Sequence, residues 1–112
     1  VVHSCIENET FSCMGNDMFR LTLNEIEFDT IILAGIETHI CVYQTAIGLI
    51  DYGYKVETVT NAVSSRFDIN NKVGLERVHD AGSKLTTVEL ILFYLQKQAV
   101  GNRFKKLIQL VK

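Results

Sequence analysis

The chain has 112 residues, of which 47% are hydrophobic and 21% charged, with a formal net charge of −2. These values fit one globular domain that can bury a core. They argue against a basic nucleic-acid-binding protein, because the densest basic cluster, Arg103, Lys105 and Lys106, suits the polar face of a last helix. Its apolar runs are too short to cross a membrane, and the first residues show no signal-peptide pattern.

The cysteines and histidines do not form a pattern typical of a disulfide framework or a metal site. Cys5, Cys13 and Cys41 make an odd count, with no CxxC pair. A reducing compartment, and hence a cytoplasmic location, is therefore expected. His3 and His79 lie far apart without ligand spacing, so we expect neither a metal nor a cofactor.

The first half of the chain predicts a strand, a helix and a second strand. Residues 1–7 open with β-branched residues and favour a short strand. Residues 17–26 have apolar residues near helical spacing, with Asp17 as a candidate cap. Residues 29–35, "DTIILAG", form a continuous apolar run ended by Gly35. Such a run is typical of a parallel strand buried on both faces.

A long helix is predicted over residues 38–53, with Thr38 as N-cap and Gly53 at the C-terminal end. Its apolar and small residues recur at helical spacing: Cys41, Val42, Thr45, Ala46, Leu49 and Ile50. Residues 54–60 alternate as a strand does, and residues 61–66, "NAVSSR", are expected to form a loop.

The last part of the chain predicts three further helices and a short strand. The helix over residues 68–82 has a stripe of Ile69, Val73, Leu75 or Glu76, and Val78. Residues 83–87 suit a short strand, and Thr86 or Thr87 can cap the helix that begins at Val88. Residues 102–112 read as an amphipathic helix with its apolar face formed by Phe104, Leu107, Ile108 and Val111.

This alternation predicts an α/β fold, a three-layer α/β/α arrangement with a mostly parallel, Rossmann-like sheet. Ligands of such sheets bind beyond the carboxyl ends of the strands. Residues 35–38 and 61–66 are expected at that edge.

Cys41 stands out because it lies in the first turn of a helix that follows a buried strand. The exposed N–H groups and the helix dipole there favour a thiolate, and they can also hold an oxyanion. One interpretation is a catalytic nucleophile. The other is a packed core thiol, since cysteine is among the most buried residue types.

Residues 33–66, "LAGIETHICVYQTAIGLIDYGYKVETVTNAVSSR", resemble the nucleophile region of the isochorismatase-like cysteine hydrolases. Within that family they resemble the isochorismatase domain-containing proteins of animals. The resemblance extends over "IENETFSCM", "HDAGSKLTTVELILFYL" and "FKKLIQLVK", so it covers nearly all of the chain. It implies that residues 1–112 form the C-terminal portion of one isochorismatase-like domain.

The resemblance also implies a Cys/Asp/Lys triad that hydrolyses small amides or related compounds, with Cys41 as nucleophile. It implies a cis Ile36–Glu37 peptide, with the backbone N–H groups of Glu37 and Cys41 facing the oxyanion. Ile36, Thr38 and His39 are then expected to contact a small-molecule substrate, although His39 also fits a solvent-facing position.

Other residues of the motifs have two interpretations each. Phe11 is expected as a wall of the substrate pocket, with core packing as the alternative. Arg66 can orient an anionic substrate or serve the structure, and we favour the structural role. Asn61 replaces an aspartate of the resembling loop.

Two parts of the family pattern are missing. The family's aspartate belongs to a D-x-Q motif on a central first strand upstream of Val1, and the lysine of the K-T-x-F-S motif is replaced by Asn8. We therefore expect an N-terminally truncated domain with an open sheet edge and little hydrolase activity. The alternative is a catalytically inactive binding or oligomerisation module. The expected partners are a small-molecule substrate and further copies of the chain, with neither nucleic acid nor membrane.

Overall fold

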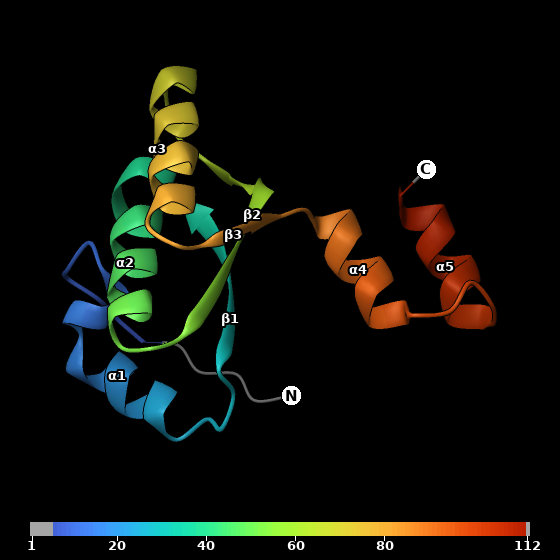
Figure 1. The fold of residues 1–112 in the computed structure, drawn as a ribbon, viewed down its shortest axis with the longest axis horizontal. Helices are drawn as coiled ribbons and strands as arrows, with labels where there is room; N and C mark the ends of the chain where they lie inside the picture. Colours follow the sequence, from blue (N-terminus) through green and yellow to red (C-terminus); the bar gives the residue numbers. More distant parts are fainter. Residues whose placement is uncertain (1–5, 112) are drawn as a thin grey trace.

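The computed structural model describes residues 6–111, in which strands alternate with helices (Figure 1). The α-helices and strands are α1 (Asp17–Asn24), β1 (Thr30–Ile36), α2 (Tyr43–Asp51), β2 (Lys55–Ser64), α3 (Asp68–Asp80), β3 (Lys84–Thr86), α4 (Val88–Gln96) and α5 (Asn102–Val111). A 3₁₀ turn, η1 (Cys13–Gly15), and a π-helical turn, η2 (Thr38–Val42), precede α1 and α2. The strand expected over residues 1–7 falls mostly outside the described residues, and Ile6 and Glu7 are not in a strand.

The sheet is parallel, with strand order β1-β2-β3. Thr30 of β1 lies opposite Lys55 of β2, and the register shifts between Leu33 and Gly35, after which Gly35 lies opposite Val63. The expected α/β class with a parallel sheet is therefore confirmed. Within residues 6–111, β1 is an edge strand that pairs with β2 alone.

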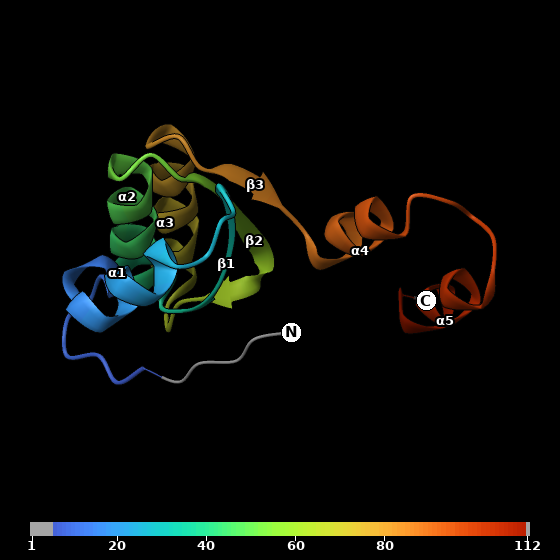
Figure 2. The same cartoon turned by 90° about the horizontal axis from the view of Figure 1, so that it is seen from below.

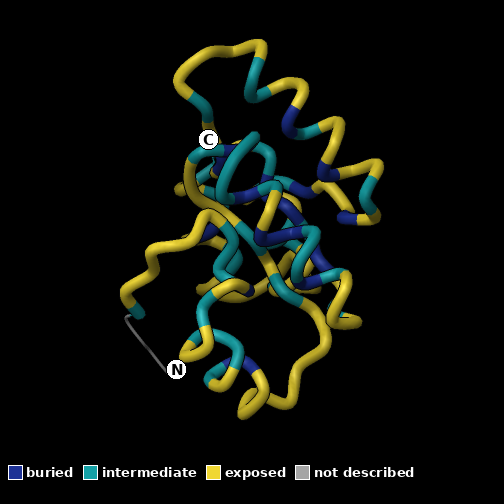
Figure 3. The backbone as a smooth tube through the Cα atoms, turned by 90° about the vertical axis from the view of Figure 1, so that its left-hand side faces the viewer, coloured by how far each residue is buried: buried dark blue, intermediate teal, exposed yellow. Residues whose placement is uncertain are grey.

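The core lies between one face of the sheet and the helices α1, α2 and α3 (Figures 2 and 3). Its buried members are Met14, Leu23, Ala46, Leu49, Val56 and Val78. The stripe predicted for the long helix is confirmed, because Val42, Thr45, Ala46 and Leu49 are buried and the other two members are half-buried. Burial of this stripe holds α2 against the sheet.

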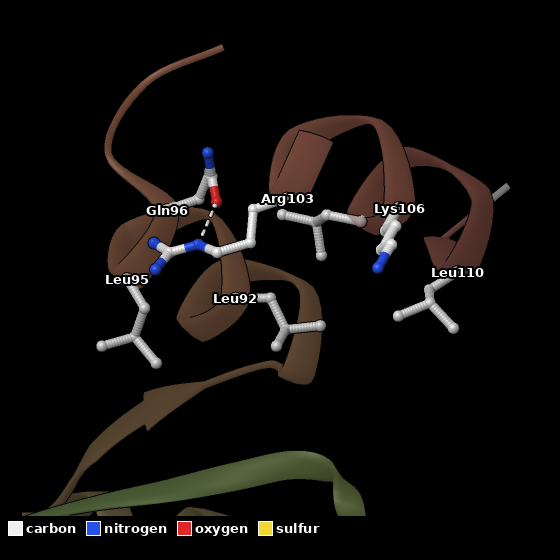
Figure 4. Close-up of a pocket in the computed structure, with 7 residues that line it drawn as sticks. Leu92, Leu95, Gln96, Arg103, Lys106 and Leu110 are labelled. Carbon is white, nitrogen blue, oxygen red and sulfur yellow. Dashed lines mark hydrogen bonds between the residues drawn. The ribbon is translucent and has the colours of Figure 1, made fainter. Parts of the chain in front are cut away.

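Helices α4 and α5 lie on the other side of the sheet and pack mainly against each other (Figure 1). Phe93 and Phe104 meet edge to face, with ring centroids 6.3 Å apart. A pocket of about 530 Å³ lies between the two helices, and Arg103 donates a hydrogen bond to Gln96 at its rim (Figure 4). The apolar face predicted for the last helix is confirmed, with Leu107 buried.

The expectation that β1 is buried on both faces is wrong. Ile31 and Leu33 are half-buried against the core, whereas Ile32 is 53% and Ile36 72% exposed. The reason is that α4 faces this side of the sheet without burying any of its own residues, and a pocket of about 520 Å³ lies between them. The second helical layer therefore exists but does not seal the sheet.

The helix ends follow the expected glycine chemistry. Gly53 has φ +93° and Gly82 has φ +113°, each directly after the C-cap of α2 and α3. The N–H of Tyr54 donates to the carbonyl of Leu49, and that of Ser83 to the carbonyl of Val78. These are Schellman motifs, in which the left-handed position favours glycine.

Three predicted caps have different outcomes. The Thr87 side chain accepts from the N–H of Leu90 and caps α4, as expected. The Asp17 cap is wrong by one residue, because the side chain of Asn16 accepts from Phe19 while Asp17 pairs with Arg20. The Thr38 cap is also wrong, because the Thr38 hydroxyl is bonded elsewhere, as described below.

One further boundary differs from the prediction. The loop expected over residues 61–66 is wrong up to Ser64, because Val63 and Ser64 continue β2 by pairing with β1. Asn61 lies within this strand, and its side chain accepts from the N–H of Val88 at the start of α4.

The predicted apolar stripe of α3 is wrong for Ile69 and Val73, which are 66% and 43% exposed. Val78 of the stripe is buried as predicted, and the other buried position of α3 is Gly74, one helical turn before it. The helix therefore approaches its neighbours through a glycine at position 74 as well as through the apolar side chain of Val78.

Replacement of Leu49, which is fully buried, by alanine should lower the free energy of unfolding by about 2–5 kcal/mol, because a cavity replaces well-packed atoms. Leu21→Ala on α1, where Leu21 is 61% exposed, should change it by less than about 0.5 kcal/mol. Urea denaturation followed by circular dichroism measures both. Equal effects of the two substitutions would contradict the assigned core.

Candidate active site around Cys41

Cys41 lies in η2, directly beyond the carboxyl end of β1, and is half-buried. The predicted single helix is thus divided into a π-helical turn and α2. The carbonyl of Glu37 accepts from the N–H groups of both Ile40 and Val42, each at 3.2 Å. The Ile36–Glu37 peptide before this turn is cis, as the resemblance implies. Single π-helical turns are frequent at functional sites.

Three consecutive residues attach this turn to the segment that follows β2. The Glu37 carboxylate accepts from the N–H of Arg66 at 2.9 Å. Thr38 donates its hydroxyl to the Asn71 side-chain oxygen at 2.5 Å, and the His39 ring Nδ1 lies 2.8 Å from the Ser65 hydroxyl. The turn that contains Cys41 is therefore fixed to the β2–α3 connection and to the first turns of α3.

Gly74 lets α3 approach this turn closely. A Cβ built on Gly74 would lie 3.0 Å from both the Cα and the backbone N of His39. These atoms belong to the backbone of a hydrogen-bonded turn, so they cannot move aside as a flexible side chain can. A glycine within a helix usually lowers stability. In α3 the close approach to the backbone of His39 explains why position 74 is a glycine.

The predicted oxyanion donors are the backbone N–H groups of Glu37 and Cys41. The carbonyl and the carboxylate of Glu37 already have structural partners within the turn and on Arg66. Its backbone N–H is the donor of this residue that could serve a ligand. The oxyanion role itself stays a prediction.

The expected substrate contacts lie around this turn, but with different exposure. Ile36 is 72% exposed at the end of β1, and Thr38 is fully buried. Because the whole residue is buried and its hydroxyl is bonded to Asn71, the substrate contact expected of Thr38 stays a prediction. The side chain of His39 is half-buried and engaged with Ser65, so the solvent-facing alternative does not describe it.

The segment that carries the family's lysine position packs beside α2. The N–H of Cys13 donates to the Thr45 hydroxyl at 3.0 Å, one turn after Cys41 on the same helical face. Asn8 itself is exposed and makes three hydrogen bonds with Thr10, at 2.7, 2.8 and 3.1 Å. Phe11 is 63% exposed, which rules out core packing for it.

Arg66 contributes to the site through its backbone. Its N–H holds Glu37, while its guanidinium lies 5.3 Å from the centre of the Phe67 ring. This position is compatible with the favoured structural role.

Sequence reasoning missed Asn71 and Gly74. Asn71 was recognised only as part of a helix, although an amide in the first turns of a helix at the carboxyl edge of a sheet is well placed for a site. Gly74 gave a clearer signal, because an interior helical glycine often marks close backbone approach.

Within residues 6–111, no three His, Cys, Asp or Glu side chains lie close enough together to hold a metal ion. His3 and Cys5 lie outside the described residues. In the same part of the chain, every helix is too short or too polar to span a membrane.

Gly74→Ala should lower the free energy of unfolding by about 1–3 kcal/mol, because the added methyl group meets the backbone of His39. Elsewhere in a helix, the same change would raise it by up to about 1 kcal/mol. Urea denaturation gives the sign. Lys72→Ala, an exposed position of the same helix, is the control. A stabilised Gly74→Ala variant would contradict this packing.

Comparison with known proteins places these features in a family. The isochorismatase domain model matches residues 2–89. A secreted isochorismatase effector, Isc1 of Phytophthora sojae, is 41% identical over 93 residues, which cover 83% of this chain and 44% of that protein. Isochorismatase domain-containing protein 2 of Bos taurus is 37% identical over 83 residues, 74% of this chain and 41% of that protein. The chain thus spans less than half the length of these two curated relatives.

Solved structures agree with the fold. The MAR1 ribonuclease of Caenorhabditis elegans superposes with a TM-score of 0.79 at 32% identity, covering 93% of this chain and 53% of that one. The nicotinamidase/pyrazinamidase PncA of Bacillus subtilis superposes with a TM-score of 0.68 at 26% identity, covering 72% of this chain and 45% of that one. The family model, the relatives and the parallel sheet together show that this chain belongs to the isochorismatase family and has an isochorismatase-like fold.

Proposed function

We propose that the chain is the C-terminal portion of a cysteine hydrolase domain for small amides or related acyl compounds, with Cys41 as nucleophile. The observation that carries this proposal is the position of Cys41 in η2, beyond the carboxyl end of β1 and fixed by Glu37, Thr38 and His39. Ligands of open parallel sheets bind at this edge. The similarity to a nicotinamidase supports an amide as the substrate class.

The proposed reaction begins when the Cys41 thiolate attacks the carbonyl carbon of the substrate. A C–S bond forms, and the negative charge that develops on oxygen is stabilised by the N–H groups of Glu37 and Cys41. The C–N bond then breaks as the leaving amine takes up a proton, and water hydrolyses the acyl-enzyme. An acid–base group is needed for both proton transfers.

The residues of this chain supply the nucleophile better than they supply proton transfer. Asn8 occupies the family's lysine position, and an amide side chain neither carries a positive charge nor titrates as a general acid or base. Its polar atoms are also occupied by Thr10. Loss of one partner of a catalytic unit typically costs several orders of magnitude in rate. We therefore propose that the 112 residues alone turn over amides very slowly.

The alternative function is that of an inactive family member that binds a partner or assembles with itself. The exposed apolar residues of α4 favour it, since Leu90, Tyr94 and Leu95 are at least 55% exposed. In this alternative, we propose that the chain forms a homo-oligomer in the cytoplasm. The name of the C. elegans relative makes RNA a further substrate to test, although the net charge of −2 gives no electrostatic attraction to it.

An activated ester of a small carboxylic acid should acylate Cys41 at least about tenfold faster than Cys13, which is also half-buried. A tenfold difference corresponds to about 1.4 kcal/mol of transition-state stabilisation, less than one oxyanion donor supplies. Intact-protein and peptide mass spectrometry locate and time the adduct. Cys41→Ala should abolish it, and Cys13→Ala is the matched control.

The acyl adduct should persist, because Asn8, at the family's lysine position, cannot transfer the proton that deacylation needs. Repeated turnover of the ester, of nicotinamide or of an RNA oligonucleotide that disappears in Cys41→Ala would contradict the proposed impairment. Acylation of Cys41 no faster than that of Cys13 would contradict the nucleophile and favour the inactive module.

A further inference from the structure

The hydrogen bond between Thr38 and Asn71 attaches the Cys41 turn to α3 through a donor side chain that is fully buried. The Thr38 side chain is fully buried, and its hydroxyl lies 2.5 Å from the Asn71 side-chain oxygen. A buried hydroxyl that loses its acceptor cannot turn to water, so the whole desolvation penalty falls on the folded state. Asn71 comes from α3, thirty-three positions along the chain from Thr38.

The two neighbouring attachments are weaker restraints. The bond from the Arg66 N–H to Glu37 is exposed, and water can replace either partner. The contact between His39 and Ser65 is partly buried, as the Thr38–Asn71 bond is, but it joins the turn to a connecting segment and not to a helix. Of the three attachments, the Thr38–Asn71 bond is the one that joins the turn to a regular helix, α3. Its Thr38 side chain is fully buried.

The position of Thr38 governs the geometry of the whole turn. Thr38 is the first residue of η2, and its carbonyl accepts from the N–H of Tyr43 at the end of the turn. Cys41 lies between these two points. A displacement of Thr38 therefore changes both the π-helical bonding and the placement of the Cys41 thiol relative to the sheet.

We infer that Asn71 is a positioning residue for Cys41: it holds the Thr38 hydroxyl, and thereby keeps the nucleophile turn in place and its thiol half-buried. Gly74, one turn further along α3, supports the same face of the turn through its contact with His39. The inference rests on the proposed function for its catalytic meaning. Its structural content is independent of any substrate.

Alkylation of the native protein by iodoacetamide, read by peptide mass spectrometry, tests this role. In Asn71→Ala, and in Thr38→Val of nearly equal shape, the rate at Cys41 should rise at least about fivefold relative to that at Cys13. The reason is that a released turn uncovers the half-buried Cys41 thiol. Asn71→Asp and Thr38→Ser keep the acceptor and the hydroxyl, so the ratio should stay within about twofold of the original.

Cys13 separates local from global effects. It lies on η1, which packs against α1 and α2, and its N–H is bonded to Thr45 and not to the Cys41 turn, so general unfolding should accelerate both cysteines together. Lys72→Ala, an exposed neighbour of Asn71, should leave both rates unchanged. An unchanged Cys41 to Cys13 ratio in Asn71→Ala and Thr38→Val, or a parallel rise at both cysteines, would overturn the inference.

The same variants distinguish this inference from the proposed function. If Cys41 is not acylated by an activated ester but its alkylation ratio responds to Asn71, the proposed chemistry fails and the positioning role stands. If Cys41 is acylated and the alkylation ratio is insensitive to Asn71, the positioning role fails alone.

Discussion

The parallel pairing of β1 with β2 is the interaction on which the candidate site depends. Because the two strands run in the same direction, their carboxyl ends lie at one edge, with Ile36 opposite Ser64. The Cys41 turn and the segment leading into α3 thereby become neighbours, although they are separated in sequence by α2. The three attachments from Glu37, Thr38 and His39 then fix the turn. Cys41, the proposed nucleophile, is thus placed by the sheet and restrained by α3.

The buried core lies on one side of this sheet. The core joins α1, α2 and α3 to one face, and Thr58 and Ser83 complete it as a buried hydroxyl pair 2.8 Å apart. On the opposite face, Ile32 and the apolar residues of α4 stay largely exposed. The site belongs to the well-packed side, since Thr38, Val42 and Gly74 are buried there. The geometry of the site is therefore held by the packing of α2 and α3 on the sheet, and it does not depend on the loosely packed helices α4 and α5.

Much of the fold could be predicted from the sequence, because hydrophobic periodicity and glycine positions report local physics. The stripe from Cys41 to Ile50 and the glycines at 53 and 82 identified α2 and the helix ends. The burial of β1 could not be predicted, since it depends on how closely α4 packs. The apolar run of residues 29–35 carries no information about that distance.

The candidate site could be predicted only in part. The residues of the turn, including the cis Ile36–Glu37 peptide, followed from the family resemblance. The contributions of Asn71 and Gly74 could not, because a side chain bonded across 33 positions leaves no local pattern. Thr38 shows the difficulty: as a threonine at a helix start it fits an N-cap, and tertiary contact with α3 decided otherwise.

A crystal structure of the chain acylated at Cys41 by an activated ester would test the central claim most directly. The account predicts that the acyl oxygen lies about 3 Å from the backbone N–H groups of Glu37 and Cys41, with η2 still bonded to Asn71. An acyl group that points into solvent, away from both N–H groups, would contradict an oxyanion site at the carboxyl end of β1.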